Sequence, residues 1–191
     1  SSGLPRNVAS NVVDMLFPPG EDSRIPIIAV TGTNGKTTTT RLIAHIAKMR
    51  GKKVGYTTSD GVYIQNRLLM KGDCTGPASA EFVLKDPTVN YAVLESARGG
   101  LLRAGLGFKK CDIGVVTNVA GDHLGLKGIH TIEQLAKVKG VIPETVKPNG
   151  YAVLNADDDL VFAMANNVEC QFALFSMDEN NPRIKRHFKR G

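Results

Sequence analysis

A short glycine-rich stretch contains the residues whose types and spacing most clearly allow chemistry. Gly32-Thr33-Asn34-Gly35-Lys36-Thr37 follows an apolar run and precedes a Thr-rich segment with helical periodicity. Glycines let successive backbone N–H groups face an anion, and a helix N-terminus adds partial positive charge. In such a loop Lys36 reaches terminal phosphates and the Thr37 hydroxyl can bind magnesium. The pattern predicts a triphosphate-binding loop, although Val30 replaces one glycine of the full pattern.

Two further polar groups stand directly after predicted strands. Glu95 ends an apolar run, and Asp122-His123 lies just beyond another strand end. A carboxylate, an imidazole and the Thr37 hydroxyl around phosphate oxygens would form a magnesium site, although hard cations mostly prefer oxygen ligands. The residues alone leave open that Glu95 is a solvated strand-end carboxylate and that His123 is a surface residue.

A lysine falls on the apolar face of a predicted helix over residues 131–142. At 3.6 residues per turn, one stripe of this helix contains Ile132, Leu135, Ala136, Lys139 and Ile142. Lys137 points elsewhere and is expected to be solvated. Two interpretations of Lys139 remain: its stem packs while its ammonium reaches water, or the amine is used chemically.

The elements that must position these residues follow from the hydrophobic pattern. Apolar runs predict strands at residues 25–31, 53–57, 91–95, 113–117, 151–155 and 171–175. Helical patterns lie between them at residues 37–50, 78–85, 131–142 and 158–166, and Pro143 is expected to stop the third helix. This alternation predicts an α/β fold, a mostly parallel sheet with helices on both faces. Ligands collect beyond the carboxyl ends of such strands, so the chemistry is expected at residues 32–37 and directly after Glu95, Thr117 and Asn155.

Composition and length narrow the class of protein. A chain of 191 residues that is 42% hydrophobic and 22% charged fits one globular core. We expect that domain at residues 25–176, an incoming linker at residues 1–24 and a stub leading to a further domain at residues 177–191. No run approaches the roughly 18 apolar residues of a membrane span, and no signal peptide is evident.

Cysteine usage and charge indicate the setting and the partners. The three cysteines are far apart and lack metal-ligand spacing, which favours a reduced, cytoplasmic protein. The net charge of +6 comes largely from the tail at residues 183–190, which is interpreted as a solvated run. Because no aromatic-rich basic motif is present, we do not expect a nucleic acid as partner. The lack of an apolar run long enough to span a membrane gives no reason to expect a membrane partner either.

Taken together, these motifs resemble the ATP-binding central domain of the Mur ligase superfamily. The matching motifs are TGTNGKTT at residues 31–38, Glu95 followed by small residues, TN and DHL at residues 117–124, a downstream helical lysine, and LNADDD at residues 154–159. The superfamily joins a carboxylate to an amine, using ATP through an acyl phosphate. The resemblance implies a P-loop-containing fold with ATP and Mg²⁺ as cofactors.

The same resemblance implies roles for single residues. Thr37, Glu95 and His123 would bind Mg²⁺, Lys36 would hold the phosphates, and Asn155 would contact adenine. The expected nucleotide-binding residues are Gly32, Thr33, Asn34, Gly35, Lys36, Thr37, Thr38 and Asn155. The candidate catalytic residues are Lys36, Glu95, His123 and Lys139.

Lys139 is a candidate for carbamylation. In the sister folylpolyglutamate synthetases, a carbamylated lysine lies in a helix pattern similar to residues 135–140. Alignment to other Mur ligases favours Lys137, whereas the helical phase selects Lys139. A carbamylated Lys139 would be a carboxylate able to bind a second magnesium ion beside His123.

Longer stretches resemble one family of this superfamily, the cyanophycin synthetases. They are residues 6–20, 57–64, 72–84, 94–107 and 117–125. The resemblance implies an ADP-forming ligase domain that joins arginine to the aspartate side chains of a poly-aspartate (cyanophycin) chain, while a separate ATP-grasp domain, absent here, extends the backbone. The chain also stops where a small C-terminal domain would begin, so the fragment is expected to be inactive alone. The full-length protein is expected to be a homo-oligomer.

Two arginines just past Glu95 are candidates for substrate binding. Arg98 and Arg103 lie in a Gly-containing stretch that is expected to be a loop. Because a guanidinium offers a bidentate fork to carboxylates, these residues would suit an acidic polymer. The alternative is that both are ordinary surface arginines.

Other functions remain open from the sequence. The chain could belong to another Mur-type amino acid ligase. A P-loop kinase or hydrolase would turn over ATP without stimulation by an amino acid. A non-catalytic, nucleotide-gated scaffold would bind poly-aspartate without nucleotide and would never form ADP.

Overall fold

The fold is built on one eight-stranded sheet. The computed structural model describes residues 24–121 and 128–189. The strand order is β4-β3-β2-β5-β1-β6-β7-β8. Six strands form a continuous parallel sheet, with bounds β1 Ile27–Thr31, β2 Val54–Thr58, β5 Tyr91–Glu95, β6 Cys111–Val116, β7 Val146–Asn155 and β8 Gln171–Phe175. An antiparallel hairpin of β3 (Gly61–Ile64) and β4 (Arg67–Lys71) extends one edge.

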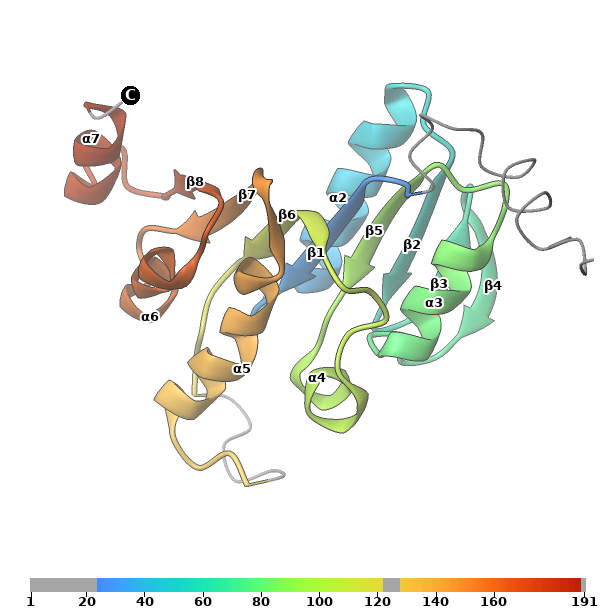
Figure 1. Cartoon of the computed structure of the whole chain (residues 1–191), viewed down its shortest axis with the longest axis horizontal. Coiled ribbons are helices and arrows are strands. Elements are labelled where there is room, and N and C mark those ends of the chain that lie inside the picture. Colours follow the sequence, from blue (N-terminus) through green and yellow to red (C-terminus); the bar gives the residue numbers. More distant parts are fainter. Residues whose placement is uncertain (1–23, 122–127, 190–191) are drawn as a thin grey trace, which may run out of the picture.

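Helices lie on both sides of this sheet. Figure 1 shows α2 (Lys36–Met49) behind the central strands, whereas α3 (Pro77–Lys85) and α5 (Ile132–Glu144) lie in front. Shorter helices complete the fold: α4 (Arg98–Ala104), α6 (Asp159–Ala163), the 3-10 helix η1 (Met164–Asn167) and α7 (Pro182–Phe188). A capping box fixes the start of α5, because the Thr131 side chain accepts from Gln134 N while the Gln134 side chain accepts from Thr131 N.

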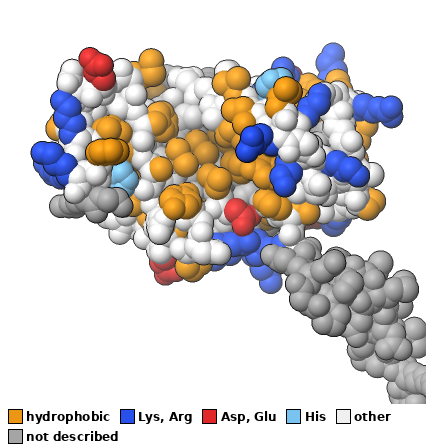
Figure 2. Space-filling view, turned by 90° about the horizontal axis from the view of Figure 1, so that it is seen from above, with side chains coloured by type: hydrophobic (Ala, Val, Ile, Leu, Met, Phe, Trp, Pro, Cys, Tyr) orange, Lys and Arg blue, Asp and Glu red, His pale blue; other side chains and the backbone are white. Residues whose placement is uncertain are grey.

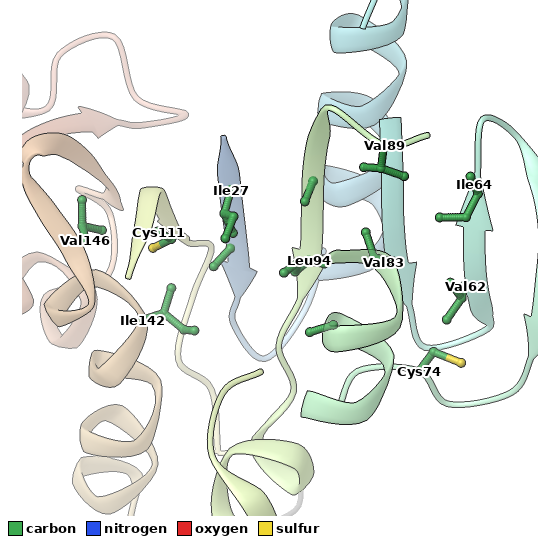
Figure 3. Packing of buried hydrophobic residues seen from close by; sticks show 13 residues of the cluster. Ile27, Val62, Ile64, Cys74, Val83, Val89, Leu94, Cys111, Ile142 and Val146 are labelled. Carbon is green, nitrogen blue, oxygen red and sulfur yellow. The ribbon is translucent and has the colours of Figure 1, made fainter. Parts of the chain in front are cut away.

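Alternate residues of the central strands fill the cores on the two faces. Ile27 and Leu94 point toward α3 and α5, where they join Val83 and Ile142 in one buried cluster (Figure 3). Their sequence neighbours point to the opposite face and pack with α2, in a cluster of Ile28, Val30, Ala44, Ala47, Val54, Val93 and Val115. This two-sided burial explains why the strands read as uninterrupted apolar runs.

The predicted fold class is confirmed, with three local corrections. The pattern gave no sign of β3, β4 or α7, and the stretch past Glu95 is the helix α4 rather than a loop. Pro143 does not stop α5, which continues to Glu144. A proline ring removes one N–H and crowds the carbonyl four residues earlier, which disfavours it inside a helix, and here α5 extends only one residue past it.

The surface and the cysteines add few constraints. Figure 2 shows Lys and Arg side chains at both ends and along one edge of the face seen from above, around a central group of apolar side chains. Cys74, Cys111 and Cys170 are free thiols. Among the described residues, no helix is long and apolar enough to cross a membrane.

Candidate active site

The glycine-rich loop connects the central strand β1 to α2, as the sequence predicts. Gly32 has a φ of 148°, and a Cβ atom there would lie 1.8 Å from Thr117 Oγ1. Gly35 caps α2 in a left-handed conformation with a φ of 80°. Both positions therefore require glycine, one for space and both for backbone conformation. The result is a loop whose N–H groups precede a helix N-terminus, the arrangement that binds phosphate.

The segment after β6 holds this loop in place. Thr33 N donates to Asn118 O at 2.9 Å, and Asn34 N donates to Asn118 Oδ1 at 2.9 Å. Thr117 Oγ1 donates to Asn34 O at 2.7 Å. The ends of β1 and β6 therefore form one rigid rim, which agrees with the prediction that Gly32–Thr37 and the residues after Thr117 lie together.

A buried carboxylate meets the first turn of α2. Glu95, at the end of β5, is 2% exposed, and its Oε2 accepts a 2.9 Å hydrogen bond from Thr37 Oγ1. Burial raises the pKa of Glu95, while the hydrogen bonds from Thr37 and from Ser59 N partly oppose that shift. Glu95 is therefore not the solvated strand-end residue that the sequence left possible.

Ser59 is a member of this cluster that the sequence analysis missed. It follows β2, its N–H donates to Glu95 Oε2 at 3.2 Å, and its Oγ lies 3.1 Å from Thr37 Oγ1. The available signal was its position just after an apolar run, the same criterion that selected Glu95. Three elements, β2, β5 and α2, thus bring three polar side chains to one point.

The residues at this point fit a hard divalent cation. A carboxylate and two hydroxyls are oxygen donors of the kind that Mg²⁺ prefers. Within residues 24–121 and 128–189 no three His, Cys, Asp or Glu side chains cluster as a metal site. Asp122, His123 and Leu124 lie outside the described residues, and the role predicted for His123 stays a prediction.

Lys139 is buried beneath the glycine-rich loop. Its side chain is 3% exposed, and Nζ donates a 2.7 Å hydrogen bond to Gly32 O. Burial is the main cause that lowers the pKa of Lys139 to about 7, and the charges of Lys36 and Arg98 act in the same direction. Lys137 is exposed. The helical phase argument thus identified the inward lysine correctly.

A small basic pocket lies between the loop and α4. It has a volume of about 190 Å³, and Lys36, Arg98 and Lys139 all line it. Lys36 Nζ also donates to Thr33 O at 2.8 Å. Arg103 does not line this pocket; its Nε donates to Gly99 O at 2.9 Å, and the residue is exposed. The structure therefore brings one of the two candidate arginines to the site.

A larger and mostly apolar pocket opens on the α2 side of the loop. It has a volume of about 720 Å³ and contains Asn155 and Phe175, together with Ile28, Asn34, Gly35, Thr39, Ile43, Ile113, Val115, Thr117, Asn118 and Val153. Asn155 Nδ2 donates to Thr117 O at 2.8 Å, and its Oδ1 accepts from Asp157 N at 2.9 Å. These bonds fix the carboxamide at the pocket wall and use one of its two N–H groups and one of the two lone pairs of its oxygen. Thr38 does not line the pocket and is exposed on the first turn of α2.

The fold and the loop define a P-loop α/β domain, and comparison with known proteins defines its family. A family model described as the Mur ligase middle domain matches residues 30–190. The chain therefore belongs to the Mur ligase family.

Curated relatives refine this assignment. The chain is 65% identical over 190 residues to a cyanophycin synthetase of Synechocystis sp., covering 100% of this chain and 22% of that protein. It is 31% identical over 174 residues to a UDP-N-acetylmuramoylalanine–D-glutamate ligase of Thermoanaerobacter pseudethanolicus, covering 85% of this chain and 32% of that protein. The chain thus spans about a fifth of the length of the cyanophycin synthetases it matches.

Solved structures share the fold. A UDP-N-acetylmuramoyl-L-alanyl-D-glutamate–2,6-diaminopimelate ligase superposes with a TM-score of 0.67 at 27% identity, covering 89% of this chain and 35% of that one. A bifunctional folylpolyglutamate synthase/dihydrofolate synthase with Mn, AMPPNP and L-glutamate bound has a TM-score of 0.53 at 20% identity, covering 80% and 44%. Both support the α/β architecture described above.

Proposed function

We propose that this chain is the ATP-binding domain of an ADP-forming amide ligase that joins arginine to the side chains of poly-aspartate. The observation that carries the proposal is the 65% identity to a cyanophycin synthetase over the whole chain. The site also contains groups that such a reaction needs. They are the glycine-rich loop, Glu95 and Lys139. The net charge of +6 and the basic side chains seen in Figure 2 suit an acidic polymer.

Each element of the site has a task in this reaction. The 720 Å³ pocket takes the base of ATP against Asn155, and the loop N–H groups take the phosphates. Thr37 and Glu95 would hold a divalent cation, Mg²⁺ in our proposal, which supplies positive charge to the phosphate oxygens. A solved structure of the same fold holds Mn with AMPPNP, which agrees with that requirement.

The proposed reaction has two steps, phosphoryl transfer and amide formation. A side-chain carboxylate oxygen of the polymer attacks the terminal phosphorus of ATP, the bond to the β-phosphate oxygen breaks, and ADP leaves. Lys36 stabilises the negative charge that develops on the transferred phosphoryl group. The neutral amine of arginine next attacks the acyl carbon, inorganic phosphate leaves with the acyl oxygen, and the amine nitrogen loses a proton.

Arg98 is our candidate for orienting the polymer. It lines the 190 Å³ pocket beside Lys36, where a substrate carboxylate must lie to reach the terminal phosphate. A guanidinium can hold such a carboxylate with two parallel hydrogen bonds. Arg103 lies outside that pocket and would at most contact more distant parts of the polymer.

Lys139 is proposed to be carbamylated in the active protein. Carbon dioxide reacts with a neutral amine, and a pKa of about 7 leaves a substantial neutral fraction at physiological pH. The buried position and the bond to Gly32 O place the resulting carboxylate beneath the phosphate loop. There it would serve as a further oxygen ligand for a divalent cation.

The decisive assay measures ADP release by the full-length protein that contains this chain. The proposal predicts rapid release only when poly-aspartate and arginine are both present. Turnover that neither addition stimulates would indicate a kinase or hydrolase, and polymer binding without any ADP would indicate a scaffold. Stimulation by a different amino acid would indicate another Mur-type ligase.

A further inference from the structure

Two walls of the apolar pocket come from the ends of neighbouring strands. Asn155 ends β7 and Phe175 ends β8, and these two residues are register partners in the parallel sheet. Both line the 720 Å³ pocket beside the glycine-rich loop. A main-chain hydrogen bond also connects the two strand ends, because Ala156 N donates to Phe175 O at 2.8 Å. The shape of this pocket therefore depends on how the two strand ends are held.

A single carboxylate ties the chain after one wall to the chain after the other. Asp157 Oδ1 accepts hydrogen bonds from Ser176 Oγ at 2.5 Å and from Asn181 Nδ2 at 2.8 Å, while Oδ2 accepts from Met177 N at 2.7 Å. Ser176 and Met177 directly follow Phe175. On the other side, the backbone N–H of Asp157 donates to Asn155 Oδ1 at 2.9 Å, so the main-chain position that the carboxylate contacts hold sets the orientation of the carboxamide.

Asn181, which donates to this carboxylate, is itself held in place by burial and by further hydrogen bonds. Asn181 is 7% exposed and also donates to Ala156 O at 3.3 Å, and it caps α7 by accepting from Arg183 N at 2.8 Å. Arg183 Nη1 donates to the same Ala156 carbonyl at 2.9 Å. The residues that follow β8 are thus fixed onto the loop that follows β7, and Asp157 lies at the centre of that joint.

We propose that Asp157 is a positioning residue for base recognition, because it holds Asn155 and Phe175 at the spacing that selects the base. Asp157 does not line the pocket itself, and it acts through the two wall residues. The inference rests on the proposed function, since it takes the pocket to be the base site of ATP. It adds a residue that determines specificity without touching the ligand.

Asp157→Asn in the full-length protein tests this inference. The substitution keeps the shape but replaces one of the two carboxylate oxygens by an NH₂ donor, so at least one of the three donors that reach Asp157 loses its acceptor. We expect the ratio of kcat/KM for ATP over GTP to fall by roughly tenfold through a higher KM for ATP, as expected when a contact is misplaced by an ångström or less. The kcat at saturating ATP should stay near that of the wild type, because Lys36 and Glu95 are untouched.

A matched control and a milder variant keep the test decisive. Asp178→Asn changes a nearby exposed carboxylate that accepts from Asn180 N at 2.8 Å, and it should leave nucleotide preference unchanged. Ser176→Ala removes one bond to Asp157, together with the bonds between Ser176 Oγ and the main chain of Asp178, and should lower the ATP preference less, but in the same direction. If the Asp157→Asn variant does not fold, the Ser176→Ala variant tests the role of Asp157 in its place.

The outcomes separate the inference from the function on which it rests. An unchanged ATP-to-GTP ratio, or an equal loss for both nucleotides with a lower melting temperature, would overturn the role of Asp157 and leave the ligase proposal standing. A wild-type protein that does not use ATP would remove the proposed function, and the inference with it.

Discussion

The hydroxyl of Thr37 donates a 2.9 Å hydrogen bond to the carboxylate of Glu95, a residue 58 positions away in the chain. The contact joins the first turn of α2 to the end of β5, and the backbone N–H of Ser59 completes it from the end of β2. Because Glu95 is 2% exposed, its charge lies where a cation can offset the cost of burial. The geometry thus supports the metal-binding role proposed for this pair.

Glu95→Gln should weaken the use of divalent metal. The amide keeps the size of the side chain but removes its charge, so the Mg²⁺ concentration for half-maximal ADP formation should rise on the order of tenfold or more. Metal titration of the full-length protein measures this. Glu81→Gln, on the exposed face of α3, is the matched control, and an unchanged metal requirement in the Glu95 variant would exclude Glu95 as a ligand.

Lys36→Ala should reduce turnover on the order of 10²-fold or more, because it removes a positive charge that faces the developing phosphoryl charge. The rate of arginine addition at saturating substrates measures the effect. Lys48→Ala changes an exposed lysine on the last turn of the same helix and should be silent. Arginine addition within a few-fold of the wild type would rule out the phosphate-loop assignment.

Asn155→Ala should weaken ATP binding by about 1 to 3 kcal/mol and reduce discrimination against GTP, because a carboxamide can donate to and accept from the adenine edge. Nucleotide competition measures both quantities. Asn167→Ala, an exposed asparagine at the end of η1, controls for a general effect of the substitution. If affinity and selectivity both persist in the Asn155 variant, another group reads the base.

Lys139→Ala should abolish arginine addition and partly regain it with formate or acetate, since a small carboxylate can replace the carbamate. The control is Lys137→Ala, which alters the exposed lysine of the same helix and should remain near wild type. Arginine incorporation with and without added formate is the measurement. Loss of activity in the Lys137 variant instead, or normal turnover of the Lys139 variant, would show that the modified lysine was assigned wrongly.

The lowered pKa of Lys139 also predicts a pH dependence of stability. Its pKa is about 7 in the folded protein and 10.5 ordinarily, so the unfolded chain binds more protons between these values. Stability from this group therefore rises with pH, by up to about 1.4 kcal/mol per unit. Denaturant unfolding in CO₂-free buffer should show a smaller rise across this window for Lys139→Met than for the wild type. Equal slopes would mean that the amine is solvated when folded.

Much of the site could be predicted because parallel strands deliver their carboxyl ends to one edge. Gly32, Glu95, Thr117 and Asn155 each follow an apolar run, and the sheet places those runs side by side. The burial of Lys139 followed from helical phase alone. In both cases the local period of the sequence already determines which way the side chain points.

The missed features depend on contacts that the local pattern does not encode. Strand β4 is exposed at all five positions and so lacks an apolar alternation, and the preceding turn uses Gln65 and Asn66 at positive φ in place of glycine. In α4, Gly100 suggested a loop, but a Cβ there would lie 2.8 Å from Thr75 O. Gly100 is therefore required because α4 packs closely against the main chain at Thr75, and it does not mark a loop. The position of Ser59 just after a predicted strand was a local signal, but its contact with Glu95 exists only in the tertiary structure.

The central claim is that ATP cleavage forms an amide between poly-aspartate and arginine. Its most direct test measures, in one reaction of the full-length protein, the ADP released and the labelled arginine bound to the polymer. We expect one arginine in amide linkage for each ADP, with no polymer-bound arginine and no sustained ADP release when arginine or poly-aspartate is omitted. ADP released without polymer-bound arginine would contradict it.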